Sequence, residues 1–303
     1  MKLFPSLILG LLFFITGCGP QKDPNIDSVS TGSIEISVDE SFKPVIEEEL
    51  TMYKNTYPLT TITARYKTEA ECLKDIFYDS ATRMVIVTRG LSENEENFFK
   101  DSLHYRPSWN LLALDGIAVI VAKGSRDSTF TMAQLADYIT GRKRGKKVIF
   151  DGLSATSTFR FVLDSLLKGD KPDTTVTQAA PNSIEVMNYV ATDTAAIGLV
   201  GFSWIGNPEV PEQLEMLKKI KICAIRCEIC EGKPFIKPTQ ISITSRSYPM
   251  VRGLYYILRE NYSGLGTGLA NFMRYERGQL IFRRFYLAPV MEFNIRNVKI
   301  NIK

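Results

Sequence analysis

The chain of 303 residues contains a single histidine, His104. One histidine excludes most Ser–His and Cys–His catalytic pairs and every site that needs several histidines around a metal. The formal net charge of +4 is small for this length, so nothing in it indicates a nucleic-acid partner. We therefore expect His104 to lie in a surface loop, and we expect no enzymatic activity, no cofactor and no metal site.

Cysteine is also scarce, with five residues. Cys72 lies on a helical pattern and is expected to be a buried apolar side chain. Three others have the Cys-x3-Cys-x2-Cys spacing of the iron–sulfur motif of radical SAM enzymes, namely Cys223, Cys227 and Cys230. Such a cluster needs a reducing compartment, whereas the N-terminus indicates export. One disulfide with a spare thiol, or free thiols throughout, is therefore favoured over a cluster or another metal site.

No apolar run outside the N-terminus is long enough to cross a membrane. The N-terminus begins with Met1-Lys2, continues with an apolar core at 7–15 and ends in Ile15-Thr16-Gly17-Cys18. This order is typical of a secretory signal. Its last four residues resemble a bacterial lipobox, in which Cys18 becomes the lipid-modified first residue of the mature protein.

These features predict a signal peptide at 1–17, an acylated (palmitate-bearing) Cys18 and a flexible polar tether over 18–32. The lipid alone would then hold the protein to a membrane. We expect it in the bacterial cell envelope, on the periplasmic or extracellular side.

The rest of the chain alternates between strand-like and helix-like patterns. Strand patterns lie at 33–38, 61–66, 84–92, 114–121, 148–150, 195–200, 238–244 and 248–258. Helical patterns follow the first three of these, and others lie at 131–139 and 214–222. Several strand runs are apolar throughout, which favours strands that are covered on both faces. The pattern predicts an α/β protein.

Three strands are each followed by hydroxyl-bearing residues and then a helix. Ser41 follows the first strand, Thr88-Arg89 follows the third, and residues 151–160 follow the strand at 148–150. Ligands of open α/β sheets bind at the carboxyl ends of strands, and helix N-termini attract anions. Residues 151–160 alone fit an ordinary capped helix better than an anion site. The three junctions together predict an oxyanion site.

Four motifs occur in the same order as in the phosphate-binding proteins of ABC transporters. They are Leu114-Asp-Gly-Ile-Ala-Val-Ile-Val, Ala196-Ile-Gly-Leu-Val-Gly, Tyr248-Pro-Met-Val-Arg-Gly-Leu-Tyr, and Gly278-Gln279 with Leu287-Ala-Pro289. On these motifs the chain resembles that family over residues 33–292.

This resemblance implies a two-lobed periplasmic-binding-protein (type II) fold. Each lobe is a mixed sheet flanked by helices, two strands cross between the lobes, and the ligand is trapped by hinge closure. Lobe I would comprise 33–115 and 248–303, and lobe II 116–247. The crossings would lie near 115–119 and 247–255.

The resemblance also implies three ligand loops. Arg89 would be the main counter-charge, Ser154 a secondary candidate, and Arg160 is expected to point away from the cleft. The first loop lacks the family's usual Gly-Ser-x-Thr, and the third has Ser157 where glycine is usual. The implied ligand-binding residues are Ser41, Phe42, Thr88, Arg89, Thr156, Ser157 and Thr158.

A phosphate-selective site needs an acceptor for the proton that phosphate carries and sulfate lacks. The candidates are Asp39, Glu40, Asp115 and Asp151, among which the sequence does not choose. The favoured interpretation is a monomeric lipoprotein that captures inorganic phosphate and delivers it to the permease subunits of an ABC importer. The alternatives are a receptor for sulfate, molybdate or tungstate, and a sensor or surface lipoprotein without transport.

Overall fold

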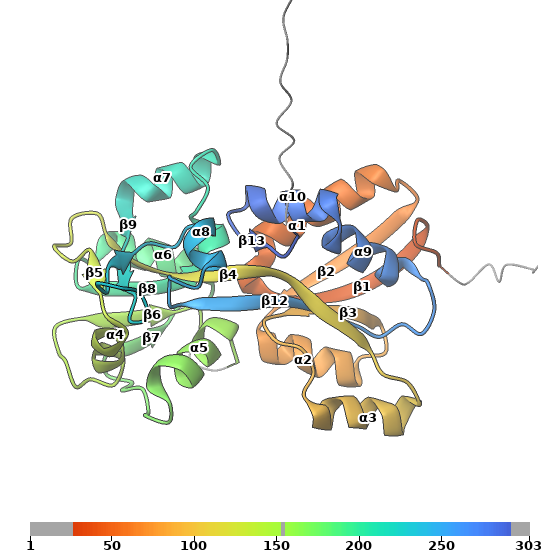
Figure 1. Ribbon diagram of the computed structural model, residues 1–303, viewed down its shortest axis with the longest axis horizontal. Helices are drawn as coiled ribbons and strands as arrows, with labels where there is room; N and C mark the ends of the chain where they lie inside the picture. The colour runs from red at the N-terminus through yellow and green to blue at the C-terminus, as the bar shows by residue number, and fades with distance from the viewer. Residues whose placement is uncertain (1–26, 153–154, 292–303) are drawn as a thin grey trace, which may run out of the picture.

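The computed structural model describes residues 27–152 and 155–291 (Figure 1). The predicted signal peptide, Cys18, most of the tether and Ser154 lie outside the described residues. Within the described ranges no helix combines the length and apolar character that a membrane span requires.

The helices and strands alternate through most of the chain. The strands are β1 (Gly32–Asp39), β2 (Thr60–Lys67), β3 (Thr82–Val87), β4 (Ser108–Ala122), β5 (Thr129–Phe130), β6 (Lys147–Phe150), β7 (Thr177–Ala179), β8 (Ala196–Gly201), β9 (Ile220–Ile222), β10 (Ala224–Arg226), β11 (Phe235–Ile236), β12 (Val251–Leu258) and β13 (Ala288–Pro289). The helices are α1 (Lys43–Thr56), α2 (Glu69–Tyr78), α3 (Glu93–Leu103), α4 (Met132–Ile139), α5 (Ser157–Phe161), α6 (Ser183–Thr192), α7 (Pro211–Lys219), α8 (Gln240–Thr244), α9 (Leu265–Arg274) and α10 (Glu276–Arg284), with 3₁₀ turns η1 (Glu40–Phe42) and η3 (Phe202–Trp204) and a π-helical turn η2 (Val162–Leu167).

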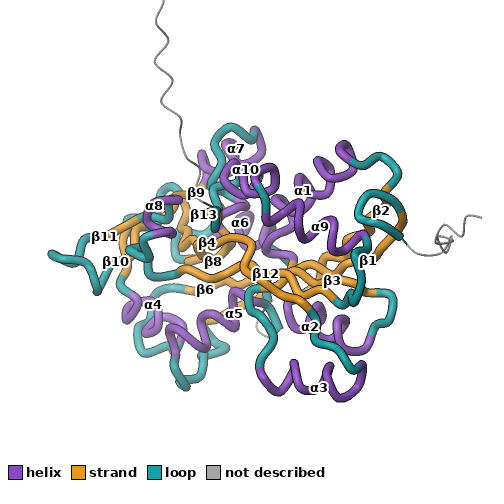
Figure 2. Tube along the Cα trace, turned by 45° about the vertical axis from the view of Figure 1, so that its right-hand side comes forward, coloured by secondary structure: helices purple, strands orange, loops and turns teal. Residues whose placement is uncertain are grey.

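Two strands connect the two ends of the molecule. The main sheet has the order β2-β1-β3-β12-β4-β8-β6-β7. The first part of β4 pairs antiparallel with β12, and its second part pairs with β8 and β9. In Figure 1, β4 and β12 run between a group containing α1–α3, α9 and α10 and a group containing α4–α8. Figure 2 shows the strands as one band with helices above and below it.

The apolar core is divided in the same way. One buried cluster contains Ile36 of β1, Ile86 of β3 and Leu269 of α9, and another contains Val119 of β4, Val148 of β6 and Leu199 of β8. Chain segments before β4 and after β12 thus share a core, as the two-lobed prediction requires. The residue boundaries of the lobes stay a prediction.

Two element predictions were wrong. The alternating run at 238–244 predicted a strand, but residues 240–244 form α8, because Thr239 and Ser242 make a reciprocal capping box. Ile241 is 83% exposed whereas Ile243 is buried, so the alternating apolar residues of this run do not mark one face of a strand. The helix predicted over 214–222 ends at Lys219, and residues 220–222 form β9 against β4.

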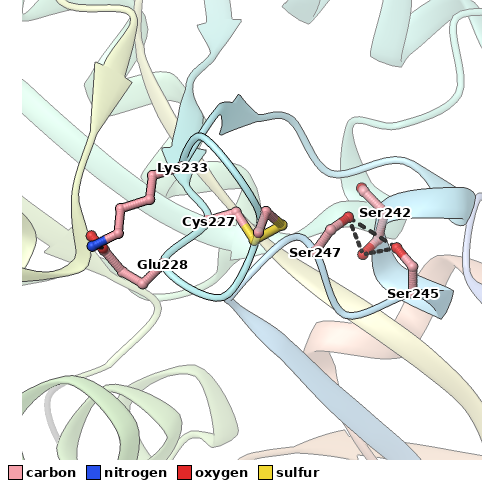
Figure 3. The surroundings of a disulfide bond; sticks show 7 residues. Cys227, Glu228, Lys233, Ser242, Ser245 and Ser247 are labelled. Carbon is pink, nitrogen blue, oxygen red and sulfur yellow. Dashed lines mark hydrogen bonds and ion pairs between the residues drawn. A yellow bond between two sulfur atoms is a disulfide. The ribbon is translucent and has the colours of Figure 1, made fainter.

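The cysteines follow the favoured interpretation. Cys227 and Cys230 form a disulfide beside β10 (Figure 3), whereas Cys223 and Cys72 are buried free thiols. The disulfide consumes two of the three thiolates that an iron–sulfur motif would need. His104 is exposed at the end of α3, as predicted.

Candidate functional site

Buried polar side chains from both lobes meet beside β4 and β12. We call this set the polar cluster; no member is more than 7% exposed. Burying so many polar groups is costly unless they are paired with one another or with a ligand. The polar cluster consists of Asp39, Ser41, Asp115, Asp151, Ser157, Thr158 and Arg252.

Arg252 lies at the centre of the polar cluster. Residues 252 and 115 are cross-strand partners in the β12–β4 register. The Arg252 Nε donates to Asp115 Oδ2 at 3.0 Å, and its Nη1 donates to the hydroxyls of Ser157 and Thr158 at 2.7 and 3.2 Å. Its guanidinium also lies over the Phe42 ring, 4.8 Å from the centroid. One cation therefore connects a crossing strand with loops of both lobes.

The hydroxyls of the two lobes also approach each other. Thr156 caps α5 by accepting from the Phe159 N–H, which places Ser157 and Thr158 at the start of the helix. The Ser41 Oγ lies 3.4 Å from both the Ser157 Oγ and Asp151 Oδ2. Ser41 itself lies in η1, where its N–H donates to Asp39 Oδ1, and Phe42 is the N-cap residue of α1.

The carboxyl groups of the polar cluster are only partly paired. Asp39, Asp115 and Asp151 each keep one oxygen without a hydrogen-bond partner among the described residues. Burial raises the pKa of Asp39 to about 7, although Arg252 opposes the shift. Burial likewise raises the pKa of Asp115 and of Asp151 against the effect of Arg252. The polar cluster thus offers hydrogen-bond acceptors beside a cation and several hydroxyl donors.

Other predicted residues lie outside the polar cluster. The Thr88 N–H and hydroxyl both donate to Glu69, and Arg89 makes a paired contact with Glu95 at 2.7 and 2.8 Å. Glu40 accepts from the Ser183 hydroxyl at 3.0 Å, which joins the two lobes at their edge. The polar cluster thus contains residues of the first and third predicted loops, whereas Thr88 of the second loop lies outside it and accepts from Arg160 at 2.6 Å.

Sequence reasoning missed Arg252 as a site residue. It stands in the quoted 248–255 motif, and it is the only charged residue between Met250 and Leu258. Asp115 is equally isolated within the 114–121 run. Two opposite charges in two apolar strands are a signal for a buried ion pair, but only the register of the strands places them opposite each other. No group of metal-ligating side chains suited to an ion occurs in the described part of the chain.

A family model described as the PBP superfamily domain matches residues 23–276. The chain belongs to the PBP superfamily. The matched range contains the two crossing strands and ends where α10 begins, and the assignment agrees with the predicted fold class. No curated protein sequence matches the chain.

Solved structures with this fold include transport receptors and regulators. A Clostridium perfringens protein assigned as a phosphate ABC transporter substrate-binding protein, solved with bound phosphate, has a TM-score of 0.71 and 20% identity, and the match covers 86% of this chain and 100% of that one. An ABC-type phosphate transport receptor from Vibrio cholerae has a TM-score of 0.62 and 15% identity over 85% and 100% of the two chains. The regulatory domain of MetR, a LysR-family regulator from Neisseria meningitidis, has a TM-score of 0.52 and 14% identity, and the match covers 87% of this chain and 99% of that one. At these identities the likeness shows the fold, and the ligand has to be inferred from the site.

Proposed function

We propose that this PBP-superfamily protein binds inorganic phosphate between its lobes and delivers it unchanged to an ABC importer. The observation that carries the proposal is the polar cluster, in which Arg252 and the hydroxyls of Ser41 and Ser157 converge from different segments. Charge-assisted and hydroxyl donors of this kind suit a small tetrahedral oxyanion. The bound phosphate in the Clostridium perfringens structure supports the same ligand.

The carboxyl groups favour phosphate over sulfate. When Asp39 and Asp151 are ionised, an oxyanion without a proton has nothing to donate to their free oxygens. Phosphate near neutral pH carries at least one proton and satisfies one of these acceptors. Asp115 is less suited because Arg252 already engages its other oxygen directly.

The cellular setting remains part of the proposal. We infer an extracytoplasmic, monomeric lipoprotein that is anchored through Cys18 and works with membrane-embedded permease subunits. The disulfide between Cys227 and Cys230 supports an oxidising compartment. The lipobox and the polar tether support the anchor.

Isothermal titration of the chain without its first 18 residues tests this function. Phosphate is expected to bind with one site per chain, and sulfate at least about 100-fold more weakly, because a sulfate ion leaves a buried carboxylate unpaired. If sulfate, molybdate or tungstate binds more tightly than phosphate, that ion and not phosphate is the ligand. Failure to bind any of these ions would favour a sensor or surface lipoprotein.

A further inference from the structure

The Glu69 carboxylate lies next to the polar cluster in an unusual set of contacts. Glu69 begins α2 and is 2% exposed. It accepts from the Thr88 N–H at 2.9 Å and from the Thr88 hydroxyl at 2.5 Å. It also accepts from the Arg160 Nε at 2.6 Å and Nη2 at 3.1 Å. Four donors therefore surround one carboxylate.

This donor set is the kind that holds a free oxyanion. It combines a backbone N–H, a hydroxyl and the two-pronged face of a guanidinium. Although burial raises the pKa of Glu69, Arg160 and Thr88 outweigh it and hold the pKa below its ordinary value, so the carboxylate is ionised near neutral pH. Glu69 thus occupies an anion position built from the second predicted loop, which explains why Thr88 does not reach the polar cluster.

The contact crosses from one lobe to the other. Glu69 and Thr88 belong to α2 and the end of β3, whereas Arg160 belongs to α5, and Figure 1 shows α2 and α5 on the same side of the crossing strands. Beside the ion pair, the Ala70 N–H donates to the Ala155 carbonyl at 3.0 Å. The ion pair therefore links the two lobes in the arrangement that the structure shows.

We propose that Glu69 and Arg160 are positioning residues that set the affinity for the ligand by holding the lobes closed, with Glu69 acting as a built-in anion. The proposal rests on the proposed function for its affinity readout. The affinity of a two-state receptor scales with the fraction of molecules in the competent conformation. A contact that exists only in the closed state raises that fraction and tightens binding without touching the ligand.

A small anion can reach this position from solvent. A surface pocket of about 430 Å³ borders it, lined by Glu69, Ala70, Leu73, Arg89, Ala155, Thr156, Phe159, Arg160 and Leu163. If the Glu69 side chain is shortened to alanine, formate has the charge and the size to replace the missing carboxylate. A purely structural role for Glu69 would show no such response.

The test compares phosphate titrations of wild type and Glu69→Ala in excess sodium formate and in sodium chloride of equal ionic strength. In chloride, Glu69→Ala is expected to bind phosphate about tenfold more weakly, since charged hydrogen bonds of this kind are lost. Formate is expected to restore most of that affinity and to leave wild type unchanged. The matched control is Asp164→Asn, which removes the 61%-exposed partner of the same Arg160 and is expected to bind like wild type.

Small-angle scattering of the ligand-free proteins keeps the inference separate from the function. Glu69→Ala is expected to have a larger radius of gyration than wild type, and formate is expected to reverse the increase. Equal radii, or a loss of affinity that formate does not reverse, would overturn the inference even if phosphate binds. If wild type binds no phosphate, the proposed function is wrong, and the comparison of the radii of gyration alone tests the inference about Glu69 and Arg160. Should Glu69→Ala not fold, Glu69→Gln keeps the shape, and unchanged affinity and radius in that variant would also overturn the inference.

Discussion

Replacing Arg252 by alanine is expected to weaken phosphate binding by at least about 100-fold. Arg252 is the one guanidinium in the polar cluster, and its Nη1 reaches the hydroxyls of both Ser157 and Thr158. Its removal takes away the one positive charge among the cluster residues, which faces three carboxyl groups. Titration calorimetry with phosphate measures the loss directly.

Two variants separate the contribution of Arg252 to phosphate binding from its contribution to the stability of the fold. Arg252→Ala leaves Asp115 buried and unpaired, which is expected to cost about 3–5 kcal/mol of stability. The double variant Arg252→Ala/Asp115→Asn removes that unpaired charge and is expected to regain stability but not phosphate binding. Arg89→Ala is the matched control, because Arg89 is paired with Glu95 outside the cluster and should bind phosphate nearly as wild type does. A small effect of Arg252→Ala and a large effect of Arg89→Ala would restore the role that the sequence suggested for Arg89.

Replacing Asp151 by asparagine is expected to reduce the preference for phosphate over sulfate by at least about tenfold. Asp151 Oδ2 accepts from Ser41 and Thr158, and its Oδ1 is free to accept the proton of a ligand. An amide keeps the shape of the side chain but replaces one acceptor by a donor, which suits sulfate better than phosphate. Competition titrations with both ions measure the ratio. Asp170→Asn, at an exposed ion pair of the same lobe, is the control.

Asp151→Asn is also expected to change how the free energy of unfolding depends on pH. Because burial raises the folded-state pKa of Asp151, the folded protein binds this proton more tightly than the unfolded chain. Wild type therefore loses stability as the pH rises above about 4, the ordinary pKa of aspartate, towards the raised value. Asp151→Asn has no proton to lose, so its unfolding free energy relative to wild type should rise as the pH increases above about 4. A pH-independent difference in urea unfolding, with selectivity unchanged, would show that Asp151 is paired elsewhere.

Much of the candidate site could be predicted from local patterns in the sequence. The hydroxyls of Ser41, Ser157 and Thr158 could be found because each lies shortly after a strand and just before or at the start of a helix, a relation that spans few residues. The alternation in 238–244 misled for the same reason, since two isoleucines in a short run fit a strand or a capped helical turn equally well.

Long-range pairing decided the rest. Arg252 enters the site because β12 and β4 pair in a register that sets it opposite Asp115, across 137 positions of sequence. Sequence reasoning ranked Arg89 above Arg160 and did not consider Arg252 as a site residue. Arg89 forms an ion pair with Glu95 of the same lobe, whereas Arg160 forms an ion pair with Glu69 of the other lobe. Such choices depend on which carboxylate lies nearest in space, which no local pattern contains.

The most direct test of the central claim is to locate the oxyanion. Crystals grown with arsenate, a phosphate analogue with an anomalous signal, would place the ion independently of any fitted density. We predict one strong arsenic peak per chain, within hydrogen-bonding distance of the Ser157 hydroxyl and the Arg252 guanidinium. A peak beside Arg89 instead, or no peak in crystals of a protein that binds arsenate in solution, would contradict the account.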